Sequence, residues 1–423
     1  MATSAPTPLP ALAPPLLGRA ATPSASAVGA TDTRRLAFID NMRILMIIMV
    51  IAHHAGQPYG PTGGFWPIND ARHAPLLGPF FTVNASFGMG LFFLISAAFL
   101  PASYDRKGPR AFLRDRLRRI GLPFLIGTLV FFIPAFSVIE GPFTGGPLAF
   151  LRDFLVSYFG PWHFGHLWFL AHLLVAMTAY ALWRRLVPRS AAGGGRSAPL
   201  PGTGAILGFI AALGLATFVV RIRFPIDYWT PLPLLVPVEY AHLPQYASLF
   251  VVGLVAGHSG WFRRIPTRLG LLWLAVGLAT AALAYAHSLV APWLGTNWFT
   301  SGGANWNSLA QSLWEAALCT SLAIGLPVLF REVADRQGPF LKSLAADSYT
   351  VYVIHIAVLL TMQAALANAA LPPLVKFILV ALVGVPLCFL LAAGLRRLSG
   401  MPRRHSRQKT AGANSPGRQE VRR

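Results

Sequence analysis

Long apolar stretches recur along the chain, and they limit its possible folds more than any other feature. A helix needs about 20 apolar residues to cross a hydrocarbon core of roughly 30 Å. Inside lipid, only helices and closed barrels satisfy every backbone polar group. The sequence predicts ten helical spans, at residues 41–59, 80–101, 120–138, 164–184, 203–221, 244–259, 268–291, 309–330, 347–368 and 373–396.

The composition agrees with a membrane protein and argues against a soluble one. Hydrophobic residues make up 55% of the 423 residues, and charged residues only 12%. The formal net charge of +21 would suit nucleic-acid binding in a soluble domain. Here the basic residues fall between the apolar stretches, where membrane topology explains them. We therefore expect no nucleic-acid partner.

The basic residues also predict an orientation in the membrane. If the ten spans are correct, the connections on one side hold only five of the 35 Lys and Arg residues, namely Arg72, Arg152, Arg221, Arg223 and Lys376. The other side and both ends of the chain hold the rest. Because cytoplasmic segments are enriched in Lys and Arg, both termini are predicted to be cytoplasmic. The fold class is thus an all-α polytopic membrane protein with about ten transmembrane helices.

Composition divides the chain into three parts. Residues 1–35 are rich in Ala, Pro, Ser and Thr and are predicted to be a disordered N-terminal segment. Residues 36–398 form the transmembrane domain, and residues 399–423 are predicted to be a disordered basic tail. The only cysteines, Cys319 and Cys388, lie inside apolar stretches, which favours neither a disulfide framework nor a cysteine-based metal site.

The first span, RILMIIMVIAHH, carries an arginine at one end and two histidines at the other. Arg43 and His54 differ by about 1,100° of helical rotation, three turns plus ~20°, and therefore share a face. His53 is rotated away from that line. An axial separation of ~16 Å places Arg43 at the cytoplasmic headgroups and His54 near the middle of the membrane.

These residues have structural and functional interpretations. Arg43 suits a snorkelling topogenic residue, and His54 an interhelical hydrogen bond. However, ionisable groups at membrane depth commonly face a functional cavity. A cation at the cytoplasmic end and a deep imidazole on one face suit a ligand such as acyl-coenzyme A, with an anionic head and a reactive far end. Asp40 either orients the Arg43 guanidinium or balances its charge.

Several segments resemble the membrane acyltransferase-3 family in matching order. They are FIDNMRILMIIMVIAHHAGQPYG, GLFFLISAAFLPASYDRKGPRAFLRDRLRRIGLPFLIG, GHLWFLAHLLV, and QYASLFVVGLVAG followed by SYTVYVIHIAVL. One departure is Ala97-Ala98, where relatives tend to carry Gly-Tyr. The resemblance is nearest to glucan-modifying enzymes that succinylate periplasmic glucans. It implies transfer of an acyl group, from acetyl to succinyl, from cytoplasmic acyl-coenzyme A to a hydroxyl.

The resemblance also implies residue roles. His54 would be the essential base and Arg43 the arginine of the family signature. A neutral imidazole can take the proton of an acceptor hydroxyl as that hydroxyl attacks the thioester. A covalent acyl-histidine is the alternative. Arg116 and Arg119, near the cytoplasmic end of the third span, suit coenzyme A phosphates, although positive-inside topology explains them equally well.

Other polar residues are weaker candidates for lining the substrate site. Tyr352 and His355 lie about one turn apart and could share a cavity, or could form packing hydrogen bonds. His166 and Trp168 are expected at the outer interface, as anchors or as acceptor-binding residues. Glu239 would line the acceptor side or lie in a solvated loop. The histidines include no recognised metal-binding spacing, so we expect no metal.

The sequence therefore predicts an O-acyltransferase, multi-pass in the bacterial inner membrane. Its partners would be an acyl-coenzyme A donor, a hydroxyl of a glycan or small molecule, and membrane lipid. Acyl-coenzyme A would be a co-substrate, and no permanently bound cofactor is expected. The alternative is a transporter or flippase, because ten spans with polar residues inside also suit a secondary carrier. No convincing internal repeat supports that alternative.

Overall fold

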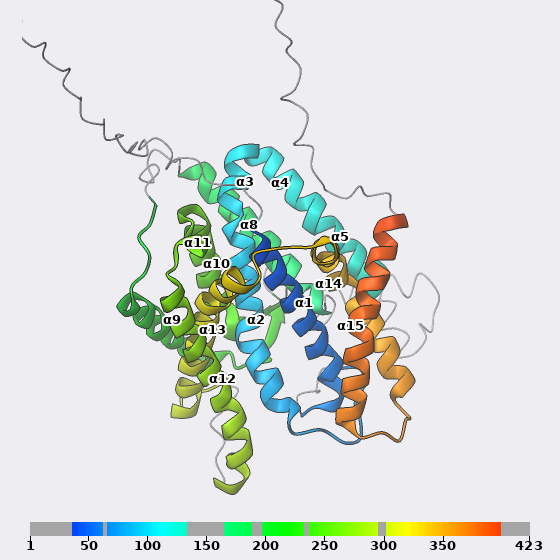
Figure 1. Cartoon of the computed structure of the whole chain (residues 1–423). Helices are drawn as coiled ribbons and strands as arrows, with labels where there is room; N and C mark the ends of the chain where they lie inside the picture. The colour runs from blue at the N-terminus through cyan, green and yellow to red at the C-terminus, as the bar shows by residue number, and fades with distance from the viewer. Residues whose placement is uncertain are drawn as a thin grey trace, which may run out of the picture. The chain divides into compact units, whose positions relative to one another are not determined.

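The computed structural model of the protein describes residues 36–61, 66–132, 165–187, 197–231, 237–294 and 302–398 (Figure 1). The predicted disordered segments, 1–35 and 399–423, lie outside this part of the chain. In chain order the helices are α1 (Ala37–Gly56), η2 (Gln57–Tyr59), α2 (Leu77–Ala98), α3 (Leu100–Lys107), α4 (Pro109–Arg116), η4 (Leu117–Gly121), α5 (Leu122–Ile126), η5 (Gly127–Phe132), η6 (Gly165–Leu167), α8 (Trp168–Leu186), α9 (Thr203–Arg223), η7 (Tyr240–His242), α10 (Leu243–Ser259), α11 (Trp261–Arg264), α12 (Thr267–Leu294), α13 (Trp306–Val333), α14 (Pro339–Leu366) and α15 (Pro373–Leu398).

Within the described residues, eight helical segments are long and apolar enough to cross a membrane. They contain α1, α2, α8, α9, α12, α13, α14 and α15. The all-helical, multi-span fold class is thereby confirmed. The predicted span 244–259 corresponds to α10, which has 17 residues. The predicted span 120–138 is helical as far as Phe132, and its last residues fall outside the described part. The full count of ten stays a prediction.

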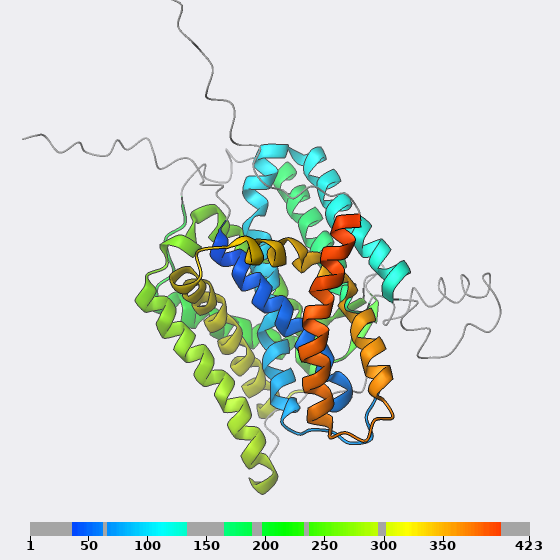
Figure 2. The ribbon, with the colours of Figure 1, turned by 45° about the vertical axis from the view of Figure 1, so that its right-hand side comes forward.

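Helix α1 packs against several of the other spans. It contacts α2, α13, α14 and α15 (Figures 1 and 2). Its sequence explains this position, because apolar residues occur on every side of the helix and a helix that is apolar all round is usually buried. Phe38, Met42 and Ile51 have at most 1% of their surface exposed. The predicted site residues on α1 are therefore carried by a helix that packs against other spans along much of its length.

Helices α2 and α10 approach closely because small residues face one another. A Cβ atom added at Gly257 would lie 1.8 Å from the backbone oxygen of Ala98, and one added at Gly253 would lie 2.2 Å from that of Leu94. Small residues four positions apart allow this kind of contact between membrane helices. The Ala97-Ala98 pair is thus part of a helix contact with α10.

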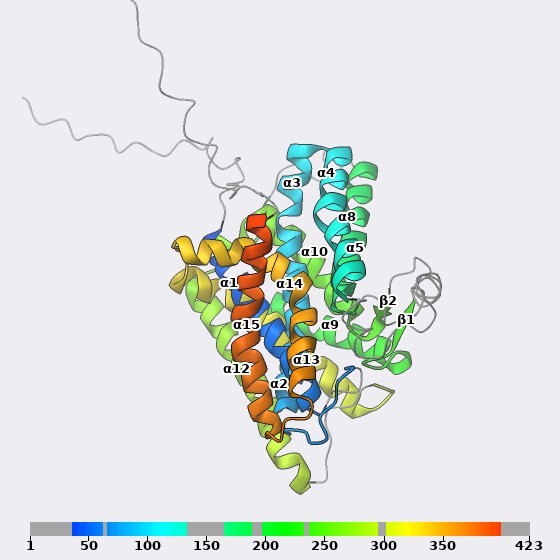
Figure 3. The same ribbon diagram turned by 90° about the vertical axis from the view of Figure 1, so that its right-hand side faces the viewer.

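A short hairpin interrupts the helices between α9 and η7. Strand β1 (Trp229–Pro231) pairs antiparallel with β2 (Pro237–Glu239), and Trp229 lies opposite Glu239 (Figure 3). The turn before it places Asp227 at a φ of 65°, a left-handed conformation that aspartate tolerates better than most residues. The hairpin contributes polar side chains to one wall of the cavity that contains His54.

Candidate active site

A cavity of about 250 Å³ lies where α1, α2, the start of α8, the hairpin and α10 meet. Both apolar and ionisable side chains face it. Its lining residues are Met46, Met49, Val50, His53, His54, Asn84, Ala85, Phe87, Gly88, Met89, Phe92, His166, Trp168, Ile226, Asp227, Trp229, Glu239, His242, Tyr246 and Tyr352.

His54 faces this cavity from the last turns of α1. Its Nδ1 lies 2.9 Å from the backbone oxygen of Val50, one turn earlier in the same helix. A carbonyl oxygen only accepts hydrogen bonds, so this contact requires a proton on Nδ1. In the neutral ring, Nε2 is then the basic nitrogen. The imidazole is therefore held in the tautomer that a general base needs.

Two further histidines gather around His54. The Nε2 atom of His355, on α14, lies 3.2 Å from His54 Nδ1, and His355 Nδ1 lies 2.7 Å from the backbone oxygen of Tyr352. If His355 carries its proton on Nδ1, its Nε2 accepts from His54, and both rings have consistent tautomers. The ring of His166 lies 4.6 Å from that of His355, centre to centre. Tyr352 joins the cluster by donating its hydroxyl to the backbone oxygen of His166.

Two side chains from outside α1, those of Trp66 and Gln363, also hold His54 in place. The ring of Trp66 stacks on the imidazole at a centroid distance of 5.6 Å. Trp66 Nε1 donates to Gln363 Oε1 at 2.7 Å, and Gln363 Nε2 donates to the backbone oxygen of His54 at 3.0 Å. Gln363 is fully buried. The orientation of His54 thus depends on α1 itself, on the segment that contains Trp66, and on α14.

Arg43 and Asp40, the other two predicted site residues on α1, lie about one and two turns before the cavity-lining part of the helix. Arg43 Nη1 lies 3.9 Å from Asp40 Oδ1, so the pairing expected from their spacing is present. Neither residue lines the cavity, whose first α1 residue is Met46. His53 does line the cavity, contrary to the expectation from helical rotation. The cavity wall is wide enough to include two adjacent positions of the helix.

Arg116 and Arg119 belong to an ionic cluster centred on Asp115, outside the cavity. Arg119 Nε lies 2.6 Å from Asp115 Oδ1, and Lys107 Nζ lies 2.6 Å from Asp115 Oδ2. Arg116 donates to the hydroxyl of Ser103 at 2.8 Å. The Asp115 carboxyl is partly buried, which opposes its ionisation, but Lys107 and the arginines lower its pKa overall. Several positive charges are therefore held together at this predicted cytoplasmic surface.

Most of the weaker candidates for the substrate site lie together around the cavity. Tyr352, His166, Trp168 and Glu239 all line the cavity. His355 contacts His54 and completes the histidine cluster. His166 is 8% exposed and Glu239 7%, so neither occupies the exposed position that an interfacial anchor or a solvated loop would give. Their positions on the cavity wall place them next to the histidine cluster.

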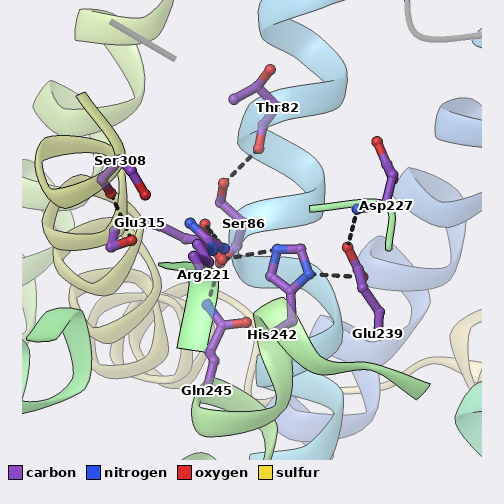
Figure 4. Close-up of polar contacts among 10 residues, drawn as sticks. Thr82, Ser86, Arg221, Asp227, Glu239, His242, Gln245, Ser308 and Glu315 are labelled. Carbon is purple, nitrogen blue, oxygen red and sulfur yellow. Dashed lines mark hydrogen bonds and ion pairs between the residues drawn. The ribbon is translucent and has the colours of Figure 1, made fainter. Parts of the chain in front are cut away.

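Sequence analysis missed a buried chain of charges behind the hairpin wall (Figure 4). Arg221 Nη2 lies 2.6 Å from Glu315 Oε2, and His242 Nε2 lies 3.1 Å from Glu315 Oε1. His242 Nδ1 contacts Glu239 Oε2 at 2.8 Å, and Glu239 Oε1 accepts from the backbone N–H of Asp227 at 2.9 Å. A glutamate inside the predicted span 309–330 was the available signal, because acidic residues in spans are costly.

His242 lies between two carboxylates, and its charge follows from that position. Burial disfavours the charged ring, but Glu239 and Glu315 raise the pKa of His242 to about 10. Burial likewise opposes ionisation of Glu239, and contact with His242 lowers the pKa of that carboxyl. The chain from Arg221 to Glu239 therefore carries two positive and two negative charges that balance.

Among the described residues, no group of three or more His, Cys, Asp or Glu side chains is arranged to hold a metal ion. The chemistry that the described side chains support is proton transfer by an oriented imidazole in a partly apolar cavity. Fold and site together define a multi-span membrane protein with a histidine cluster at its centre.

Comparison with known proteins gives the family. The family model described as "Acyltransferase domain" matches residues 36–393. The chain belongs to this family, the acyltransferase-3 family, and the resemblance inferred from the sequence is confirmed.

Curated relatives with similar sequences include proteins from several strains of one species. Glucans biosynthesis protein C from Escherichia coli is 28% identical over 150 residues in strain SMS-3-5, in strain 536 of serotype O6:K15:H31, and in strain K12. The matched stretch covers 34% of this chain and 38% of each relative. No solved structure gives a significant match.

Proposed function

We propose that the protein transfers an acyl group from cytoplasmic acyl-coenzyme A to a hydroxyl of a glycan or another acceptor, with His54 as the general base. The observation that carries this proposal is the orientation of His54. Its Nδ1 is bound to the Val50 carbonyl at 2.9 Å, in a ring that lines a cavity large enough for a small acyl group. Membership of the acyltransferase-3 family supports the reaction class.

The proposed reaction needs one proton acceptor that later becomes a donor. His54 Nε2 takes the proton of the acceptor hydroxyl while the hydroxyl oxygen attacks the thioester carbonyl. The carbon–sulfur bond then breaks, and the imidazolium returns the proton to the coenzyme A thiolate. In the covalent alternative, Nε2 itself attacks the carbonyl and the carbon–sulfur bond breaks, which releases the coenzyme A thiolate. The acceptor hydroxyl then attacks the acyl carbon, the bond from Nε2 to that carbon breaks, and the hydroxyl proton passes to the freed imidazole or to the thiolate.

Donor and acceptor are proposed to approach from opposite ends of the cavity. Arg43, Arg116 and Arg119 would hold coenzyme A phosphates at the cytoplasmic face, where arginine is a favourable partner for phosphate. Glu239, His166 and Trp168 would line the acceptor side, with Tyr352 and His355 supporting the base. A glycan acceptor is proposed because the matched relatives are named for glucans biosynthesis. The proposed location is the bacterial inner membrane.

The decisive experiment replaces His54 by Ala in protein reconstituted in lipid nanodiscs. With labelled acetyl-coenzyme A as donor and glucan oligosaccharides as acceptor, we expect transfer and release of free coenzyme A to fall by about 10²- to 10⁴-fold, the usual contribution of a general base. The exposed His73→Ala variant is the matched control and retains turnover. Full turnover by His54→Ala would refute the assignment.

The same assay separates the two chemical routes. After brief mixing with labelled donor in the absence of acceptor, a covalent route leaves the label on a peptide that contains residue 54, whereas direct transfer leaves the protein unlabelled. The transporter alternative gains nothing from the family match. It predicts accumulation of a substrate in proteoliposomes without any acyl donor.

A further inference from the structure

The distribution of charge over the cavity wall bears on which acyl groups it can accept. Among the described residues that line the cavity there are two carboxylates, Asp227 and Glu239, and no lysine or arginine. The other ionisable groups of the wall are imidazoles and tyrosines. His54 acts as a base only while it is neutral, and the charged ring of His242 is held between Glu239 and Glu315, so the described wall offers a negatively charged substrate group no cation that is not already paired.

The wall contributed by α1 and α2 is apolar. Met46, Met49 and Val50 lie on α1, and Met89 and Phe92 on α2. Methionine side chains fill irregular spaces and adapt to small apolar ligands. A short hydrocarbon acyl chain would be well accommodated here, whereas a carboxylate would lose its hydration without gaining a partner.

The nearby cations either do not line the cavity or are paired with carboxylates. Arg221 Nη2 lies 2.6 Å from Glu315, and Arg221 is not a lining residue. His242 does line the cavity, but its two ring nitrogens contact Glu239 at 2.8 Å and Glu315 at 3.1 Å (Figure 4). This buried chain balances its own charges, and Asp227 adds one further carboxylate at the cavity surface.

We infer that the cavity selects an uncharged acyl group, and that Asp227 and Glu239 disfavour acyl groups that end in a carboxylate. This inference rests on the proposed function and specifies its donor. An acyl carboxylate would be placed near like charges in a poorly hydrated space, where repulsion and desolvation both oppose binding. The resemblance to glucan-modifying enzymes that transfer succinyl groups implies the opposite preference.

Two pairs of donors isolate the effect of charge from that of size. Propionyl- and malonyl-coenzyme A, and likewise butyryl- and succinyl-coenzyme A, differ by the exchange of a terminal methyl for a carboxylate. Each would compete with labelled acetyl-coenzyme A for the purified protein in nanodiscs, a binding measurement that needs no acceptor. We expect each diacid to compete about 100-fold more weakly than its neutral partner.

A conservative variant tests the wall itself. Asp227→Asn removes the charge and keeps a residue that tolerates the left-handed backbone, so we expect the discrimination in both pairs to fall about tenfold. The matched control is Asp105→Asn on α3, which removes a carboxylate paired with Arg184 outside the cavity and leaves the discrimination unchanged.

The possible outcomes are distinct. Weak diacid binding that improves in Asp227→Asn supports the inference. Succinyl- or malonyl-coenzyme A that binds as well as its neutral partner overturns it while the proposed acyl transfer stands, and so does a discrimination that Asp227→Asn leaves intact. If folded protein binds none of the acyl-coenzyme A donors, the proposed function fails and the inference fails with it.

Discussion

His54 is hydrogen-bonded through Nδ1, so Nε2 is the basic nitrogen of the neutral ring. Its Nδ1 contacts the Val50 carbonyl at 2.9 Å and His355 Nε2 at 3.2 Å, so two groups favour the same tautomer. An imidazole with a fixed tautomer does not have to reorganise before it accepts a proton. At this scale the site depends both on His54 and on the groups that hold it.

His355 is therefore predicted to be a positioning residue. Replacing His355 by Phe keeps a ring in the packed space and removes both nitrogens, so kcat is expected to fall about tenfold or more as His54 samples other orientations. The KM for acyl-coenzyme A should change little, because His355 does not line the cavity. Steady-state kinetics with His73→Phe as control provide the measurement. A raised KM with an unchanged kcat would assign His355 to donor binding instead.

His54 was predicted from its depth in the membrane, from the family resemblance, and from the 11-residue separation that places it on the same helical face as Arg43. The partners of His54 could not be found in this way. His166 and His355 come from helices that are distant in sequence, and their contact with α1 depends on tertiary packing. Glu315 carried a usable signal as an acidic residue within an apolar stretch, but its partner His242 lies in a short connection whose position no periodicity fixes.

At the scale of elements, the contact between α2 and α10 depends on glycine. A methyl group at Gly257 would overlap the Ala98 backbone oxygen at 1.8 Å. We expect Gly257→Ala to destabilise the protein by about 1–3 kcal/mol or more, as overpacking commonly does. Gly208→Ala on α9 is the matched control, because an added Cβ there meets nothing within 4 Å. Thermal unfolding in detergent measures both, and equal stability of the two variants would contradict this packing.

The charge chain joins α9, α13 and the hairpin, and it predicts a pH dependence of stability. Glu239 and Glu315 raise the pKa of His242 from 6.5 to about 10, so protonated His242 stabilises the folded state. This contribution is fully present below pH 6.5 and is lost as the pH rises through about 10. The unfolding temperature should therefore decline across that range, and the decline should be smaller in His242→Gln. An identical decline in the variant would place its origin elsewhere.

The lengths of the apolar stretches predicted most of the membrane spans, but not the short helices and strands between them. The run 80–101 corresponds to α2, but the chain then continues through α3 and turns at Gly108, where φ is 72°, into α4. The hairpin of β1 and β2 was not predicted either, because its strands have only three residues each. The hairpin forms part of the cavity wall, so the sequence did not predict all of the surroundings of His54.

At the scale of the whole molecule, the basic residues predict which face is cytoplasmic. The connection between α1 and α2 contains exposed His73, on the predicted outer side, and the connection between α13 and α14 contains exposed Asp335, on the predicted cytoplasmic side. A membrane-impermeant maleimide should label His73→Cys in intact spheroplasts and Asp335→Cys only after permeabilisation. The natural Cys319 and Cys388 are buried, so background labelling should be low. The reverse pattern would invert the topology.

The contact between His54 and His355 joins residues 301 positions apart. During synthesis, α1 enters the membrane early, while α14 and α15, which pack against it, emerge late. His54 therefore lacks its contact with His355 until nearly the whole chain has been translated. A ribosome-bound or prematurely terminated product would carry Arg43 and His54 without the complete histidine cluster.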